Sequence, residues 1–136
     1  MTSIIADASA IVAVLLEEAQ TERARSSLRA ADRVLCPDFA LIECYNAFWK
    51  LHRRGAISKV LLLNAPQRIR KVPTELFSTD PLFEPAARLA LLLDHPIYDC
   101  LYVALTEAAG GRLVTCDKRL ATAAERYDKI EVELID

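Results

Sequence analysis

Short apolar runs that end in an aspartate recur at three widely separated points of the chain. Each aspartate is in turn followed by a run with helical periodicity. The runs and their acids are residues 3–6 with Asp7, residues 96–98 with Asp99, and residues 113–116 with Asp117. Strands that alternate with helices form parallel sheets, whose carboxyl-terminal strand ends lie along one edge, where ligands bind. The pattern therefore predicts an α/β chain with carboxylates gathered at one edge of the sheet.

The same alternation continues along the whole chain. Strands are predicted at residues 3–6, 34–36, 74–77, 113–116 and 130–135. Helices are predicted at residues 9–18, 20–31, 37–54, from 58 up to a kink or stop at Pro66, 80–93, 99–109 and 118–126. This order predicts a three-layer α/β/α sandwich with a central, mainly parallel sheet. A length of 136 residues makes one domain, residues 1–136, the expectation.

A fourth acid, Glu43, interrupts an otherwise apolar helical face. It is predicted in the middle of the helix at 37–54, where no capping residue is needed. A Glu beside an apolar face needs a partner or solvent to stay ionised. One alternative is a surface Glu paired with Asn46 or Lys50; the other is a member of a shared acidic site.

The three aspartates also have two interpretations. Each precedes a predicted helix, and Asp is a favoured N-cap because its carboxylate accepts bonds from free backbone N–H groups. Taken with Glu43, however, they form a set of carboxylates that repel one another unless cations hold them. Oxygen ligands of this kind suit Mg²⁺ or Mn²⁺, and metal held by carboxylates points to phosphoryl chemistry. Ser9 and Thr115 are candidates to support the site by hydrogen bonding, although Ser9 is equally suited to capping the first helix.

The charge balance does not by itself indicate a nucleic-acid partner, because the net charge is −2. When the four candidate ligands are set aside, the 17 Lys and Arg residues exceed the remaining 15 acids by two. Basic clusters occur at 50–54, 68–71 and 118–119. Lys50, Arg53 and Arg54 follow Glu43 on one predicted helix, so they are candidates to contact a phosphate backbone; the alternative is a solvated helix face.

No membrane association is expected. No apolar run approaches the roughly 18 residues that a membrane-spanning helix needs. The first residues lack the basic stretch that opens a signal peptide. These observations favour a cytoplasmic protein.

Four segments, in order, resemble those of the PIN-domain ribonucleases, specifically the VapC-like toxins of type II toxin–antitoxin pairs. The segments are residues 5–10, residues 41–47 in a helix ending at 53–55, residues 98–105 and residues 113–120. Each segment alone is a weak signal, whereas the ordered set covers the chain and is specific.

The resemblance implies a PIN-like fold in which Asp7, Glu43, Asp99 and Asp117 match the family's acidic quartet. It implies one or two Mg²⁺ or Mn²⁺ ions and cleavage of RNA, often tRNA or rRNA. It also implies a homodimer and a cognate antitoxin that covers an apolar groove.

Two other interpretations remain open. The first is a non-catalytic PIN-like module that docks an antitoxin-like partner through residues 11–16 and 60–63. The second is a phosphorylated receiver-type domain, although such domains carry two adjacent acids after the first strand and here Asp7 stands alone.

Overall fold

The computed structural model describes residues 1–136 and contains one five-stranded, all-parallel sheet. The strand order is β3-β2-β1-β4-β5. The strands are β1 (Ser3–Ala6), β2 (Arg33–Pro37), β3 (Glu75–Phe77), β4 (Arg112–Thr115) and β5 (Glu131–Leu134). The predicted parallel sheet is confirmed.

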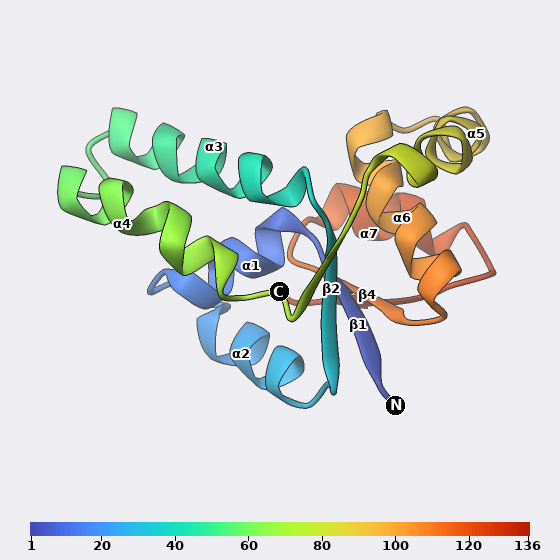
Figure 1. The fold of residues 1–136 in the computed structure, drawn as a ribbon, viewed down its shortest axis with the longest axis horizontal. Coiled ribbons are helices and arrows are strands. Elements are labelled where there is room, and N and C mark those ends of the chain that lie inside the picture. Colours follow the sequence, from blue (N-terminus) through green and yellow to red (C-terminus); the bar gives the residue numbers. More distant parts are fainter.

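Helices cover both faces of this sheet, which confirms the three-layer α/β/α prediction. In Figure 1, α1 to α4 gather on one side of the strands, and α5 to α7 gather on the other. The helices are α1 (Ala8–Leu15), α2 (Thr21–Arg29), α3 (Ala40–Arg53), α4 (Lys59–Arg70), α5 (Phe83–Leu93), α6 (Ile97–Ala109) and α7 (Lys118–Glu125), with a 3₁₀ turn η1 (Asp80–Leu82) before α5.

The winding of the chain places a crevice at the centre of the sheet. From β1 the chain moves outward to β2 and β3, and it then returns to the other side of β1 to form β4 and β5. The connections after the neighbouring strands β1 and β4 therefore leave in opposite directions. Ligands of open α/β sheets bind at such a switch point, beyond the carboxyl ends of the strands.

The central strands are buried on both faces, as expected for a sheet covered by two helical layers. Ile4, Ile5 and Ala6 of β1 are fully buried, as are Leu113 and Val114 of β4. These side chains belong to one hydrophobic cluster of 35 buried residues. The core thus holds the carboxyl ends of β1 and β4 in fixed positions.

The expectation that the apolar run at residues 96–98 resembles a strand and leads to the edge of the sheet is wrong. The α6 helix begins at Ile97, directly after Pro96. Asp94 ends α5 in the left-handed conformation, with φ of 50°, so the chain turns back on the same helical layer instead of entering the sheet. Asp99 consequently lies in the first turn of a helix and not at the end of a strand.

A stop at Pro66, one of the two predicted outcomes, is not observed, because α4 runs through this residue to Arg70. Pro66 lies on the exposed side, while Leu62, Ala65 and Ile69 of the same helix are buried. Packing of the apolar side therefore keeps the helix continuous.

No single helix is long and apolar enough to cross a membrane. Residues Asp80–Leu93 and Ile97–Ala109 pass the criterion only when taken together, by length and composition, across a bend of 113°.

The close approach of Gly111 to β1 generates a stability prediction. A Cβ at this position would lie 2.6 Å from the Ser3 carbonyl oxygen and 2.9 Å from Ile5 Cδ1. Because backbone cannot yield as a side-chain tip can, Gly111→Ala should lower the free energy of unfolding by about 3 kcal/mol. Gly55→Ala is the control, since Gly55 has open space around it and only its φ of 78° is strained, which costs about 1 kcal/mol. Urea denaturation measures both, and equal losses would contradict the close approach.

Candidate active site

All four predicted acids line one hollow of about 470 Å³ at the carboxyl edge of the sheet. Asp7 follows β1 and Asp117 follows β4, so these two flank the switch point. Glu43 comes from α3 and Asp99 from α6, which lie on opposite sides of the sheet. The fold therefore brings together acids that are as far as 110 positions apart in the chain.

Asp7 is the most buried of the four, with 4% of its surface exposed. Its Oδ1 accepts hydrogen bonds from Ser9 Oγ at 2.7 Å and from the Ala10 backbone N–H at 3.0 Å. Its Oδ2 accepts a bond from Thr115 Oγ1 at 2.7 Å. Asp7 is thus the N-cap of α1, which is one of its two interpretations, and it also lines the hollow.

The hydroxyl groups of Ser9 and Thr115 are held with their hydrogens toward Asp7. Ser9 Oγ accepts a bond from the Cys116 N–H at 2.9 Å, and Thr115 Oγ1 accepts one from the Asp117 N–H at 3.0 Å. With these lone pairs engaged, each hydroxyl donates to the Asp7 carboxylate. The backbone after β4 thereby fixes the orientation of an acid that follows β1.

Burial raises the pKa of Asp7 from 3.8 to about 7. The bonds from Thr115, Ser9 and Ala10 lower this pKa, and repulsion by Glu43 raises it further, but the loss of hydration dominates. A carboxylate in this state takes up a proton near neutral pH unless a cation compensates its charge.

Glu43 lies in the first turn of α3, not in the middle of a helix as predicted. The reason is that Pro37 stays in β2, paired with Phe77 of β3, so the helix begins at Ala40. The partner of Glu43 is neither Asn46 nor Lys50 but Tyr102 of α6, whose hydroxyl donates to Glu43 Oε1 at 2.6 Å.

The pKa of Glu43 is raised by burial. The bond from Tyr102 lowers this pKa, whereas repulsion by Asp99 and Asp117 raises it. Glu43 is therefore close enough to Asp99 and Asp117 to be affected by their charges.

Asp99 is held from outside the hollow by a histidine. His95 Nε2 donates to Asp99 Oδ2 at 2.7 Å, and the two side chains are 10% and 23% exposed. Because α6 begins two residues earlier, Asp99 is not the N-cap that was considered for it.

Asp117 caps α7, which is the alternative considered for it from the sequence. Its Oδ1 accepts bonds from the N–H groups of Arg119 and Leu120 at 2.9 and 3.3 Å. Its Oδ2 has no partner in the protein, so capping leaves one oxygen free to bind a ligand in the hollow.

The donor set fits a divalent cation that keeps much of its water. No three His, Cys, Asp or Glu side chains are arranged to close on one ion. Mg²⁺ usually binds through one or two carboxylates and retains several waters, whereas a closed all-protein cage suits other metals. Four carboxylates around a hollow of about 470 Å³ match that mode.

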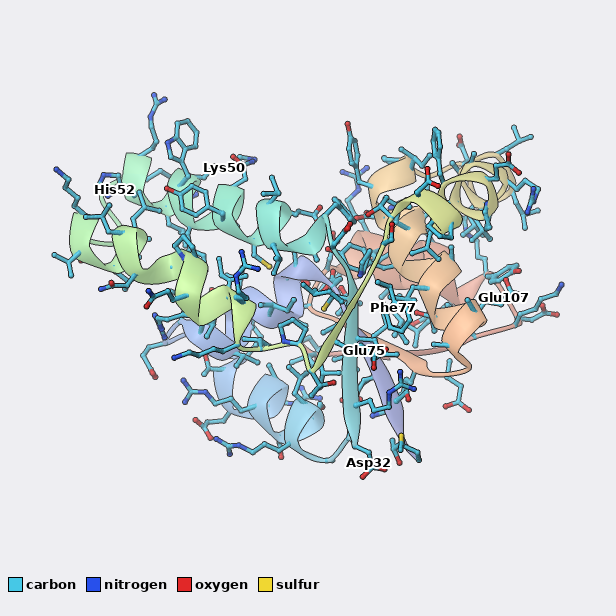
Figure 2. The ribbon with its side chains drawn as sticks, viewed as in Figure 1. Asp32, Lys50, His52, Glu75, Phe77 and Glu107 are labelled. Carbon is cyan, nitrogen blue, oxygen red and sulfur yellow. The ribbon has the colours of Figure 1, made fainter.

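Of the predicted basic group, only Lys50 lines the acidic hollow. Figure 2 shows Lys50 on α3, whereas Asp32, just before β2, lies at the other end of the view. Arg53 instead lies over the Trp49 ring, 5.1 Å from its centre, and Arg54 is exposed at the end of α3. The structure therefore brings Lys50 to the acids but not Arg53 or Arg54.

Sequence reasoning missed two residues that hold the acids, Tyr102 and His95. Neither residue is among the candidates that the sequence pattern indicates. A signal existed for His95, which stands four residues before Asp99. No sequence signal links Tyr102 to Glu43, because 59 positions separate them.

A comparison with protein families decides the identity of this arrangement. A model of the PIN domain matches residues 4–126. The chain belongs to the PIN-domain family.

Within the family, the chain is similar to proteins named VapC ribonucleases. It is 32% identical over 120 residues to Ribonuclease VapC3 of Pyrobaculum aerophilum, covering 87% of this chain and 92% of that relative. It is 31% identical over 129 residues to Ribonuclease VapC9 of Mycobacterium tuberculosis, covering 95% and 97%. The resemblance seen in the sequence is therefore confirmed.

The fold is shared with a solved structure. The crystal structure of PAE2754 from Pyrobaculum aerophilum matches with a TM-score of 0.68 at 23% sequence identity, over 90% of this chain and 84% of that chain. At this identity the likeness supports the architecture of the PIN-domain chain.

The raised pKa of Asp7 predicts how stability depends on pH in chelator. A group whose folded pKa is raised stabilises the fold fully below its unfolded pKa of 3.8, and this stabilisation is lost as pH rises through about 7. From pH 5 to pH 8 the parent should therefore lose roughly 2.5 kcal/mol of unfolding free energy relative to Asp7→Asn, which carries no charge. Urea denaturation at both pH values checks this. Asp128→Asn, at an exposed position, should follow the parent, and parallel profiles for parent and Asp7→Asn would contradict it.

The bond between Tyr102 and Glu43 predicts a titration shift. Tyr102→Phe keeps the buried ring but removes the hydroxyl that stabilises ionised Glu43, so the pKa of Glu43 should rise further. Carboxyl ¹³C NMR of the metal-free protein measures this pKa. Tyr98→Phe on the same helix, where the ring is 63% exposed, should leave the Glu43 titration unchanged. An unchanged pKa in Tyr102→Phe would show that the bond does not form in solution.

Proposed function

We propose that this PIN-domain chain is a Mg²⁺- or Mn²⁺-dependent endoribonuclease that hydrolyses phosphodiester bonds in RNA. The observation that carries the proposal is the hollow at the switch point, lined by Asp7, Glu43, Asp99 and Asp117. The names of its VapC ribonuclease relatives support the same reaction class.

One or two divalent cations held by these carboxylates would supply charge neutralisation at the phosphate and an activated water. The chain's own residues provide fixed geometry. Asp7 is immobilised by three hydrogen bonds, so it is suited to the central ligand position. Asp117 offers its free Oδ2, and Asp99 offers the oxygen that His95 does not engage.

Glu43 has a different function in the proposal. It is only partly buried, and Tyr102 engages one of its oxygens, Oε1. The other oxygen is available to hold a cation or to accept a proton from a water that attacks phosphorus. Lys50, in the wall of the same hollow, is suited to contact a phosphate oxygen of the RNA.

We also propose that the chain is the toxin of a toxin–antitoxin pair. A second hollow, of about 520 Å³, is apolar at Val14 and Leu15 and carries Arg25 and Arg68 in its wall. This chemistry fits an acidic, amphipathic segment of an antitoxin. Of the groove predicted from the sequence, Val14 and Leu15 of residues 11–16 line this hollow, whereas residues 60–63 do not.

A homodimer is part of the proposal. Phe83, Leu91 and Leu92 of α5 and Ile42 of α3 are large apolar side chains that are more than half exposed. Such surfaces are typical of contacts between copies of a chain.

The nuclease proposal predicts that RNA cleavage requires both metal and the four acids. Asp7→Asn, Asp99→Asn and Asp117→Asn should each lower kcat by roughly 100-fold or more, since even residues that only orient metal ligands are worth 10–100-fold. Cleavage of labelled RNA in Mg²⁺, and again in excess EDTA, measures this. Asp128→Asn is the matched control and should retain full activity.

Full cleavage in EDTA, or in Asp7→Asn, would reject the mechanism. Calorimetric titration with Mg²⁺ separates the alternative: a chain that takes up no Mg²⁺ but binds its partner would be the non-catalytic docking module.

A further inference from the structure

A smaller hollow next to the acidic one carries the opposite charge. It has a volume of about 310 Å³ and contains no acid in its wall. We call it the α7 hollow; its lining consists of His95, Lys118, Arg119, Thr122, Ala123 and Arg126.

Two links place the α7 hollow directly beside the candidate catalytic acids. His95 lines the α7 hollow, and its imidazole donates to Asp99 of the acidic hollow at 2.7 Å. Lys118 lines the α7 hollow, and it follows Asp117 of the acidic hollow in the chain. The two hollows therefore adjoin at His95 and at the junction of Asp117 with Lys118.

The cationic side chains of the α7 hollow form no ion pair within the protein. Other arginines form ion pairs, as Arg23 and Arg112 do, but Lys118 and Arg119 are exposed and form none. Arg126 donates to the Leu93 carbonyl oxygen at 2.6 Å. That bond fixes its position without neutralising its charge, because the acceptor is neutral.

The basic side chains of the α7 hollow are aligned along the helix. Lys118, Thr122 and Arg126 recur every four residues, so they lie along one face of α7. From Asp117 to Arg126 the helix advances by about 14 Å. The α7 face thus leads away from the acids as a row of donors, with the hydroxyl of Thr122 between cationic side chains.

We propose that the α7 hollow binds a backbone phosphate next to the scissile phosphate of a single-stranded RNA segment. The inference rests on the proposed nuclease function. The N–H groups at the start of α7 are already engaged by Asp117. The phosphate is therefore recognised by Lys118, Arg119 and Arg126, whose side chains reach it whatever the base sequence.

The test compares Lys118→Ala/Arg119→Ala with Arg70→Ala/Lys129→Ala. Both double variants remove two exposed cations that form no ion pair, but the control pair lies where the chain approaches the amino ends of β3 and β5. Binding of a fluorescein-labelled RNA is measured by anisotropy in an Asp7→Asn background, which leaves the RNA intact. Steady-state cleavage is measured with Asp7 in place.

Removal of Lys118 and Arg119 should raise the Kd for RNA roughly tenfold at low salt. It should also make the salt dependence of binding shallower by about 0.7 for each phosphate that is no longer neutralised. In cleavage, KM should rise while kcat stays within about twofold. The control pair should match the parent. Replacing single phosphates beside the cleavage site with neutral methylphosphonates should weaken binding by the parent at one position, and that effect should vanish in the Lys118→Ala/Arg119→Ala variant.

If the parent cleaves RNA but the Lys118→Ala/Arg119→Ala variant has the same RNA affinity and the same KM, the α7 hollow is not a phosphate site. The nuclease proposal would still stand. If the Lys118→Ala/Arg119→Ala variant binds a poly-Glu peptide more weakly than the parent does but binds RNA equally well, the hollow binds a protein partner. That result would also overturn the proposal. If the parent neither binds nor cleaves RNA, this inference and the proposed function fall together.

Discussion

The burial of a carboxylate at the centre of the sheet is the constraint on which the rest of the site depends. Asp7 stands where β1 ends, almost without solvent, and it stays there because two hydroxyls and one backbone N–H bond its oxygens. Burial still dominates and raises its pKa to about 7. Because the pKa of this hydrogen-bonded acid lies near neutral pH, a cation that binds its carboxylate releases a proton.

Each of the remaining acids accepts hydrogen bonds from a different group of the protein. Tyr102 holds Glu43, His95 holds Asp99, and the first turn of α7 holds Asp117. Each partner engages a single oxygen of its acid. The arrangement combines fixed carboxylate positions with free oxygens, which is the requirement for a metal site that is ordered before its ligand arrives.

The positions of the cationic side chains around the acidic hollow indicate where the proposed RNA would bind. Lys50 of α3 lines the acidic hollow, and Lys118 and Arg119 of α7 line the adjacent hollow, so two separate elements bring cations to the carboxylates. The apolar hollow with Arg25 and Arg68 is a separate surface between α1, α2 and α4. The proposed RNA and the proposed antitoxin therefore have different primary contacts on one small chain.

The sequence by itself determined the alternation of strands and helices and the parallel sheet, because hydrophobic periodicity is a local signal. It also singled out the four acids as candidates, although only Asp7 and Asp117 follow strands. Only the tertiary structure decided that residues 96–98 join a helix, that α4 continues through Pro66, and that Glu43 meets Tyr102. It also decided that Lys50, and not Arg53 or Arg54, reaches the acids. These outcomes depend on which faces pack together across distant segments, and local propensity does not encode such contacts.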